Sequence, residues 1–405
     1  MKEDVILRDL LVSDNGGKAV GISAKKYDCN LSAGGMFNPS LFFTNENQLV
    51  CSVRHAPQMF FFDKNCLDWF SPICALPNVK SEIYYTVLDK DCGYTGKEMK
   101  NLFPGLADSL PNNIKSIEDF RFSYCDSKTI SGYGVVPSDG YKEIKTYYLS
   151  TDLESDTFSF FQIKGQEKTE KNWMPVLSDN HKDPDIIYKP GNIGIPCSLG
   201  DIKNKKLCLR NTLDGLHFRG SSQVIPYKEG YIGVLHYAEG IPTIRQLQYK
   251  HLFAKFDRDF NIVSLSKPFL FEGFDIEFCC GIADIGDSIC LSYSILDSYA
   301  SLLFIEYDFI EQLLKKDVRS SLRPELCCSR YEKKIDYLWN NGMFFPCFNL
   351  CQYLASKVSD KEKSVEYYIK SAHCIEQSSF PNAYNQANIK EHAFFRIMRQ
   401  IMNYK

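Results

Sequence analysis

The sequence has no hydrophobic run long enough to cross a membrane and no excess of basic charge. Apolar stretches such as SLLFI and MFFPCF are far shorter than the roughly 20 residues that span a bilayer. The first residues, MKEDVILRDLLVSDNGG, lack the apolar core of a secretory signal. The net charge is -3, from 47 basic and 50 acidic side chains, whereas nucleic-acid binding needs a basic surplus. We therefore expect a soluble, cytoplasmic protein with no transmembrane segment and no nucleic-acid partner.

Several common catalytic and cofactor motifs are also absent. The sequence contains no GxxxxGK phosphate-binding loop, no GxSxG nucleophile turn and no HExxH metal motif. These absences argue against a P-loop nucleotidase, an α/β-hydrolase and a zinc peptidase of the HExxH type. We expect no cofactor.

The 16 cysteines lie mostly within apolar runs and do not indicate a disulfide scaffold in a chain of 405 residues. We expect them to be buried free thiols in a reducing compartment. Cys347, Cys351, His373 and Cys374 could be assembled into a zinc site, but one CxxxC pair is weak evidence for it. We interpret these residues as apolar helix packing and expect no metal site.

Residues 1–308 are rich in short strand-like runs such as SLFFT, QLVCSV and YIGVLHY, separated by turn residues. One order recurs in them: a polar motif, an apolar strand, a turn and a second strand. The five clearest copies begin at Asn38, Glu118, Lys171, Arg219 and Glu277. Such repeats indicate an all-β fold, a five-bladed β-propeller whose four-stranded blades would gather the polar motifs around one axis. A β-sandwich or two packed β domains is the alternative.

Residues 309–405 change to a helical pattern, with Val365, Tyr368, Ile369 and Ala372 at three- and four-residue spacings. We expect a C-terminal α-helical extension that follows the propeller domain. A basic cluster between residues 315 and 334 stands at its entrance. A peripheral membrane or protein contact is one interpretation of this cluster, and a solvated helix face is the other.

The segment SIEDFRF places Glu118, Asp119 and Arg121 within four residues at a strand entrance. An acid beside a fixed cation is a common catalytic arrangement, although an isolated motif of this kind is more often a simple ion pair. In an extended strand, the side chains of Glu118 and Asp119 would point to opposite faces.

This motif belongs to an ordered set of motifs along the chain. The others are NPS at 38–40, VRH at 53–55, KNWMP at 171–175, YKP at 188–190, FRGSSQ at 218–223 and VLHY at 234–237. Over residues 36–308 the set resembles glycoside hydrolase family 130, the β-mannoside phosphorylases and mannosidases, and the related protozoan mannosyltransferase/phosphorylases. Phe120 stands where the family has proline, and Leu235 where it has tyrosine, which suggests a distant branch.

The resemblance implies an enzyme that transfers a glycosyl group to or from phosphate, with Asp119 as the catalytic acid. It implies phosphate-binding roles for Lys171, Asn172, Arg219 and His236, and substrate-binding roles for Asn38, Arg54, Glu118, Arg121 and Asp297. We add Lys189 as a further phosphate-binding candidate, and Trp173 and Glu277 as further substrate-binding candidates. Trp173 would stack on a sugar ring, unless it packs in the core, which is the commoner role of tryptophan. Because phosphate is an anionic nucleophile, such an enzyme needs no second carboxylate as base, unlike an ordinary glycosidase.

We interpret the chain as a glycosyltransferase of glycan assembly that takes a sugar phosphate or nucleotide-sugar donor and a glycan acceptor. The last-blade sequence IEFCCG and the helical extension favour this direction. An inverting β-mannoside phosphorylase, which runs the same chemistry in reverse, is the main alternative. Hydrolysis with Glu277 or Asp297 as base, and a non-catalytic glycan-binding or scaffold propeller, are the others.

Overall fold

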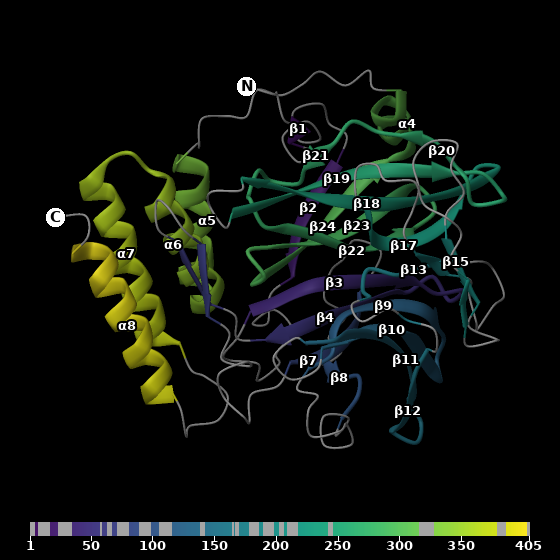
Figure 1. Ribbon diagram of the computed structural model, residues 1–405, viewed down its shortest axis with the longest axis horizontal. Helices are drawn as coiled ribbons and strands as arrows, with labels where there is room; N and C mark the ends of the chain where they lie inside the picture. Colours follow the sequence, from purple (N-terminus) through teal and green to yellow (C-terminus); the bar gives the residue numbers. More distant parts are fainter. Residues whose placement is uncertain are drawn as a thin grey trace.

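The computed structural model places strands on one side of the molecule and a group of helices on the other (Figure 1). It describes residues 5–6, 17–22, 35–56, 59–62, 67–70, 81–88, 99–104, 116–137, 142–163, 166, 170–177, 186–188, 198–201, 206–208, 218–241, 246–315, 328–378 and 386–402. Among these residues no helix is long and apolar enough to span a membrane.

Among the described residues, the strands form five large sheets and one hairpin. The first sheet contains β3 (Gly35–Phe43), β4 (Leu49–Ala56), β7 (Glu82–Leu88) and β8 (Lys100–Asn101), and the second β9 (Glu118–Cys125), β10 (Thr129–Pro137), β11 (Ile144–Asp152) and β12 (Thr157–Gln162). The third contains β13 (Met174–Pro175), β14 (Ile186–Tyr188), β15 (Ser198–Asp201) and β16 (Lys206–Cys208). The fourth contains β17 (Arg219–Tyr227), β18 (Gly230–Ile241), β19 (Gln246–Phe256), β20 (Ile262–Leu265), β21 (Phe269–Leu270) and β1 (Val5–Ile6). The fifth contains β22 (Glu277–Asp284), β23 (Ser288–Ile295), β24 (Tyr299–Glu306) and β2 (Gly17–Ile22).

The first strands of these sheets surround a common axis. β3 contacts β9, β9 contacts β13, β13 contacts β17, β17 contacts β22, and β22 contacts β3 again. A closed ring of inner strands, each followed outward by its own antiparallel sheet, defines a β-propeller, so the predicted all-β propeller is confirmed. The N-terminal β2 completes the sheet of β22–β24 as its outer strand and so ties the two ends of the propeller together.

The expectation of five equal four-stranded blades is wrong in one respect. In the part of the chain that the structure describes, four of the sheets have four strands, but the sheet that starts with β17 has six. The additional strands arise because β21 pairs with β19 and the N-terminal β1 then pairs with β21 in parallel.

Close packing and buried hydrogen bonds hold the inner strands together. A Cβ atom on Gly281 would lie 2.6 Å from the backbone nitrogen of Leu41, so β22 and β3 approach more closely than a side chain would allow. The buried Gln223 of β17 donates from Nε2 to Ser40 Oγ (2.9 Å) and to the carbonyl oxygen of Leu41 (2.7 Å). Because unpaired polar groups are unfavourable in a core, these bonds fix the relative positions of the inner strands.

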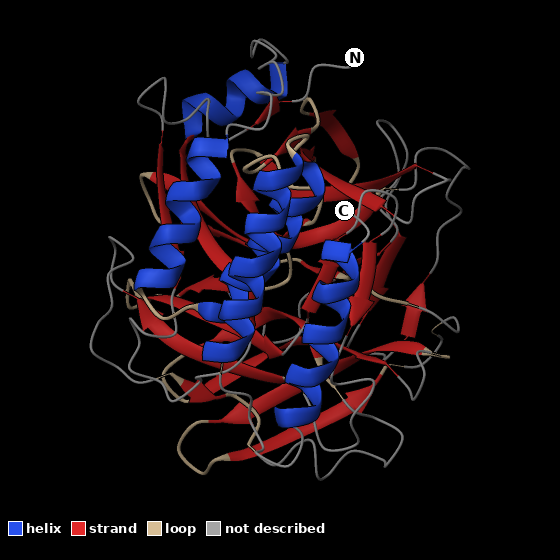
Figure 2. Ribbon diagram, turned by 90° about the vertical axis from the view of Figure 1, so that its left-hand side faces the viewer, coloured by secondary structure: helices blue, strands red, loops and turns tan. Residues whose placement is uncertain are grey.

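The C-terminal part of the chain is helical, as predicted. β24 ends at Glu306 and α4 (Tyr307–Lys315) begins at the next residue; α5 (Cys328–Asn340), α6 (Phe344–Lys357), α7 (Lys361–Gln377) and α8 (Gln386–Met402) follow. Figure 2 shows α5, α6, α7 and α8 in front of the sheets. The hairpin of β5 (Met59–Phe62) and β6 (Leu67–Phe70) packs on α6, where the rings of Phe61 and Phe348 meet at 5.5 Å.

The helices and the propeller share one hydrophobic core. Phe274, between β21 and β22, packs its ring against Tyr331 of α5 (4.8 Å) and Tyr353 of α6 (5.3 Å). At the same contact, the Lys334 ammonium lies 2.8 Å from a carboxylate oxygen of Glu272. The charge of Lys334 is thus paired with a carboxylate inside the fold. Lys316, Arg319 and Arg323 of the basic cluster lie outside the described residues.

Candidate functional site

Four of the predicted site residues adopt a backbone conformation that is rare for residues other than glycine. The φ angles are 49° at Asn38, 49° at Asp119, 67° at Asn172 and 40° at Asp297. A left-handed residue costs about 1–2 kcal/mol, and asparagine and aspartate tolerate it best. Because such strain is common at functional sites, its recurrence at the starts of three sheets and in the β23–β24 loop directs attention to this end of the propeller.

The left-handed conformation of Asp119 changes the direction of its neighbour's side chain. The Nη2 atom of Arg54 lies 2.8 Å from Glu118 Oε1, and its Nη1 atom lies 3.8 Å from Asp119 Oδ1. The expectation that Glu118 and Asp119 point to opposite faces is therefore wrong. The regular alternation of a strand is lost at Asp119, and both carboxylates face one guanidinium.

A buried chain of hydrogen bonds orients the carboxylate of Asp119. The side-chain amide of Asn38 donates from Nδ2 to Asp119 Oδ1 at 2.6 Å. The hydroxyl of Ser294, on β23, donates to Asn38 Oδ1 at 2.6 Å. Side chains from two other sheets thus fix this carboxylate.

Asp297 supplies a further carboxyl group from the loop between β23 and β24. Burial raises its pKa to about 7; the charge of Arg54 lowers the pKa, whereas Asp119 and Glu118 raise it further. The amide of Asn349 on α6 donates to the carbonyl oxygen of Leu296, the residue before Asp297, at 3.5 Å. The helical extension therefore contacts the loop that carries this carboxyl group.

Arg121 lies deeper, beneath Asp119. Its side chain is buried, donates from Nε to the carbonyl oxygen of Ser221 (2.7 Å) and from Nη1 to that of Asp119 (3.1 Å). Its guanidinium also lies 5.7 Å from the centre of the Phe278 ring. These contacts make Arg121 a buried link between the inner strands β9, β17 and β22, and a positive charge below the site.

The predicted phosphate-binding residues of the third and fourth sheets gather around His236. Arg219 pairs in register with His236 across β17 and β18. Burial lowers the pKa of His236 well below its usual range, and the neighbouring His251 and the positive charges of Arg121, Arg219 and Lys171 lower it further. Burial also lowers the pKa of His251, to about 3, so His251 is itself uncharged. His236 is therefore a neutral imidazole with cations nearby. The side chains of Lys171 and Arg219 are exposed.

Asn172 lies next to this group. A Cβ atom on Gly220 would lie 2.3 Å from the Asn172 carbonyl oxygen, so β17 passes directly beside the residue. Lys189, the remaining predicted phosphate-binding residue, lies outside the described residues.

Two predicted substrate-binding residues have other partners. Trp173 is 1% exposed and packs in the core against the rings of Tyr133 and Tyr188, so core packing, rather than sugar stacking, describes it. The buried carboxylate of Glu277 accepts hydrogen bonds from the backbone N–H groups of Phe271, Glu272 and Phe274, at 2.6, 2.8 and 2.9 Å. Glu277 holds the preceding turn and is not free to bind a sugar.

Tyr249 on β19 is a site residue that the sequence analysis missed. Its half-buried ring packs 5.8 Å from His236 and 6.5 Å from Phe278. Burial raises the pKa of Tyr249, the charges of Asp297 and Asp119 raise it further, and Arg219 lowers it. This tyrosine therefore lies between the acidic and the cationic groups. It belongs to the third strand of its sheet, away from the motifs at the sheet entrances.

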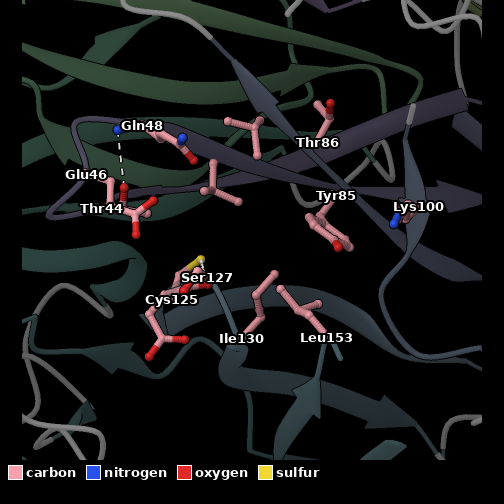
Figure 3. Close-up of a pocket in the computed structure, with 13 residues that line it drawn as sticks. Thr44, Glu46, Gln48, Tyr85, Thr86, Lys100, Cys125, Ser127, Ile130 and Leu153 are labelled. Atoms are coloured by element: carbon pink, nitrogen blue, oxygen red, sulfur yellow. Dashed lines mark hydrogen bonds between the residues drawn. The ribbon is translucent and has the colours of Figure 1, made fainter. Parts of the chain in front are cut away.

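A separate cavity of about 550 Å³ lies between the first two sheets (Figure 3). Its lining includes Thr44 and Gln48 beyond β3, Tyr85 on β7, and Cys125 at the end of β9. Thr44 and Cys125 lie at the far ends of the strands that carry Asn38 and Asp119 near their starts. None of the predicted site residues lines this cavity.

Comparison with known proteins supports the fold. No family model and no curated protein sequence matches the chain. Among solved structures, a β-1,2-mannobiose phosphorylase from Listeria innocua aligns with a TM-score of 0.50 at 15% identity, over 74% of this chain and 99% of that one. A structure from the GH130 family of mannoside phosphorylases, described as containing glycoside hydrolases that target β-1,2 mannosidic linkages in Candida mannan, aligns with a TM-score of 0.50 at 9% identity, over 76% of this chain and 97% of that one. The resemblance to family 130 that the motifs indicate is confirmed at the level of the fold.

Proposed function

We propose that this protein is a carbohydrate-active enzyme, an inverting β-mannoside phosphorylase that cleaves its substrate with inorganic phosphate. The observation that carries the proposal is the carboxylate of Asp119, held by Asn38 at 2.6 Å and faced by Arg54, with the cationic residues around His236 nearby. Two structural neighbours with a TM-score of 0.50 are a mannobiose phosphorylase and a structure from the GH130 family of mannoside phosphorylases, which is described as also containing glycoside hydrolases. These neighbours favour phosphorolysis over the glycosyltransferase reading of the sequence.

Asp119 acts as the general acid in this proposal. It delivers a proton to the glycosidic oxygen through a hydroxyl group of the bound sugar, as the family resemblance implies. Proton transfer requires a carboxyl group in one defined position, and the bonds from Ser294 to Asn38 and from Asn38 to Asp119 supply that restraint. Arg54 balances the charge of Glu118 and Asp119 in a setting where two unpaired carboxylates would repel each other.

The phosphate nucleophile binds on the cationic side, to Lys171 and Arg219. Both side chains are exposed and can reach a dianion, and charge-assisted hydrogen bonds to phosphate oxygens are among the stronger polar contacts in proteins. His236 is neutral and adds an N–H donor rather than a charge. Asn172 is a further donor in this proposal, and Asp297 and Tyr249 contact the sugar.

The direction of reaction is tested by following both products. The purified chain is incubated with β-1,2-mannobiose, the ligand of the Listeria structure, in buffers with and without inorganic phosphate. Phosphorus NMR detects any sugar 1-phosphate, and chromatography measures free mannose. We expect one sugar 1-phosphate for each bond cleaved, at a rate that rises with phosphate concentration.

Three outcomes would overturn this function. Cleavage at the same rate without phosphate would indicate a hydrolase. Transfer from a nucleotide sugar to a glycan, without phosphorolysis, would support the glycosyltransferase direction. Binding of mannosides with neither cleavage nor transfer would indicate a glycan-binding propeller.

A further inference from the structure

Three cysteine side chains meet inside the helical extension, away from the candidate site. Cys347 and Cys351 lie one turn apart on α6, and Cys374 lies on the neighbouring α7. Their sulfur atoms all lie within 4.8 Å of one another. Each residue is a free cysteine with no exposed surface.

The three cysteines are placed to bind one ligand together, whereas the neighbouring His373 is not. His373 precedes Cys374 on α7, but its side chain is exposed, because successive residues of a helix point about 100° apart. Within the described part of the chain no other histidine, cysteine or carboxylate joins the group. The candidate ligand set is therefore three thiols, with no fourth protein ligand.

The sulfur separations suit a metal ion. Three thiolates bound to zinc at about 2.3 Å in a tetrahedral arrangement lie about 3.8 Å apart. Sulfur atoms already within 4.8 Å of one another reach that spacing through small side-chain movements. Two ligands one turn apart on one helix and a third on the adjacent helix also converge on a single point without any change in the backbone.

One basic residue, Lys370, lies near the cluster. Lys370 lies one turn before Cys374 on α7, and its ammonium lies 3.2 Å from Asp336. The ammonium of Lys370 is thus already paired with a carboxylate.

We propose that Cys347, Cys351 and Cys374 bind one Zn²⁺ ion, with water or a small exogenous ligand in the fourth position. Binding exchanges the three thiol protons for the metal, so protons leave to solvent as three sulfur–zinc bonds form. Three thiolates and Zn²⁺ carry one net negative charge. A Cu⁺ ion would leave two, and an uncompensated buried charge is unfavourable.

The site would join α6 to α7 at the position where α6 supports the propeller. Asn349, which bonds the carbonyl oxygen of Leu296, lies between Cys347 and Cys351 in sequence. Zinc would therefore stiffen the helix that contacts the loop of Asp297. This role is independent of the reaction proposed above.

The test uses the full chain, reduced, stripped of metal with a chelator and titrated with Zn²⁺ against a chromophoric competitor. Co²⁺ substitution provides a second readout, because thiolate-to-cobalt charge transfer absorbs in the near ultraviolet. The variants are Cys347→Ser and Cys374→Ala. Cys290→Ser, a buried free thiol on β23, is the matched control. Circular dichroism confirms that each variant is folded.

We expect the wild type and Cys290→Ser to bind one Zn²⁺ per chain and to melt at a higher temperature with the metal. Each cluster variant should bind at least about tenfold more weakly, since it keeps only two of three ligands. The proposal is overturned if the folded, reduced wild type takes up no Zn²⁺, or if Cys290→Ser loses affinity equally. It is also overturned if Cu⁺ is retained in preference to Zn²⁺, or if the native protein contains a disulfide between these cysteines.

Discussion

Replacing Asn38 with alanine removes the amide that connects Ser294 to Asp119. The wild-type bonds are 2.6 Å on each side of this amide, and Asn38 is 6% exposed. A hydrogen bond to a charged group contributes about 1.5–3 kcal/mol. If the bond to Asp119 is needed in the transition state, its loss lowers kcat/KM by about ten- to hundredfold, at roughly 1.36 kcal/mol per factor of ten. We expect the loss to fall mainly on kcat, because the amide positions a reacting group.

The same substitution also affects the backbone, since alanine in the left-handed region is less stable than asparagine by about 1 kcal/mol. Asn47→Ala is the control for this effect. Asn47 has a φ of 58° in the exposed β3–β4 turn, and so carries the same backbone penalty away from Asp119. Steady-state phosphorolysis is measured for both variants, together with melting temperature. Wild-type kcat/KM in folded Asn38→Ala would refute the role of this amide.

Three further substitutions test other parts of the site. The pKa of Asp297 is raised from 3.8 to about 7, so the folded state retains a proton that the unfolded chain releases, and the free energy of unfolding falls as pH rises through this range. Asp297→Asn should remove this part of the fall. Identical profiles of melting temperature against pH for the two proteins would contradict this prediction. Arg219→Ala should weaken phosphate binding, measured by calorimetry, about tenfold, which is equivalent to about 1.4 kcal/mol. Arg258 is an exposed arginine that donates to a backbone carbonyl, and Arg258→Ala should leave the affinity for phosphate unchanged. Equal affinities of the two variants would remove Arg219 from the phosphate site. Asn349→Ala loses one hydrogen bond to the Leu296 carbonyl, about 1 kcal/mol, and should reduce kcat/KM several-fold without changing phosphate affinity; unchanged kcat/KM would separate the helices from catalysis.

Much of the propeller could be predicted because most of its strands are marked by patterns of neighbouring residues in the sequence. Alternating apolar residues between turn residues are sufficient to identify strands such as β4 and β23, and the helical spacing identifies α7. The six-stranded sheet could not be predicted in this way. Its additional strands, β1 and β21, have two residues each and pair across most of the length of the chain. Their pairing depends on contacts between distant parts of the chain rather than on any local pattern.

The residues of the candidate site could be predicted where motifs mark the starts of the sheets. They could not be predicted where the direction or the packing of a side chain determines whether it faces the site. The strand rule failed at Glu118 because the φ angle of Asp119 is positive. Trp173 is a residue type that often stacks on sugars, but here it packs in the core. The carboxylate of Glu277 accepts hydrogen bonds from the backbone of the turn that precedes it. Tyr249 reaches the site from a third strand with no motif. In each case the position of the side chain depends on a contact that the pattern of residues along the sequence does not reveal.

The role of Asp119 is tested most directly by comparing Asp119→Asn with the wild type in phosphorolysis of β-1,2-mannobiose. This change keeps the shape of the side chain, and Asn38 can still donate to the remaining oxygen, but the exchangeable carboxyl proton is lost. We expect turnover to fall on the order of 10²–10⁴-fold, with little change in the affinity for phosphate or disaccharide and a near wild-type melting temperature. Sugar 1-phosphate formed by folded Asp119→Asn at close to the wild-type rate would contradict the account.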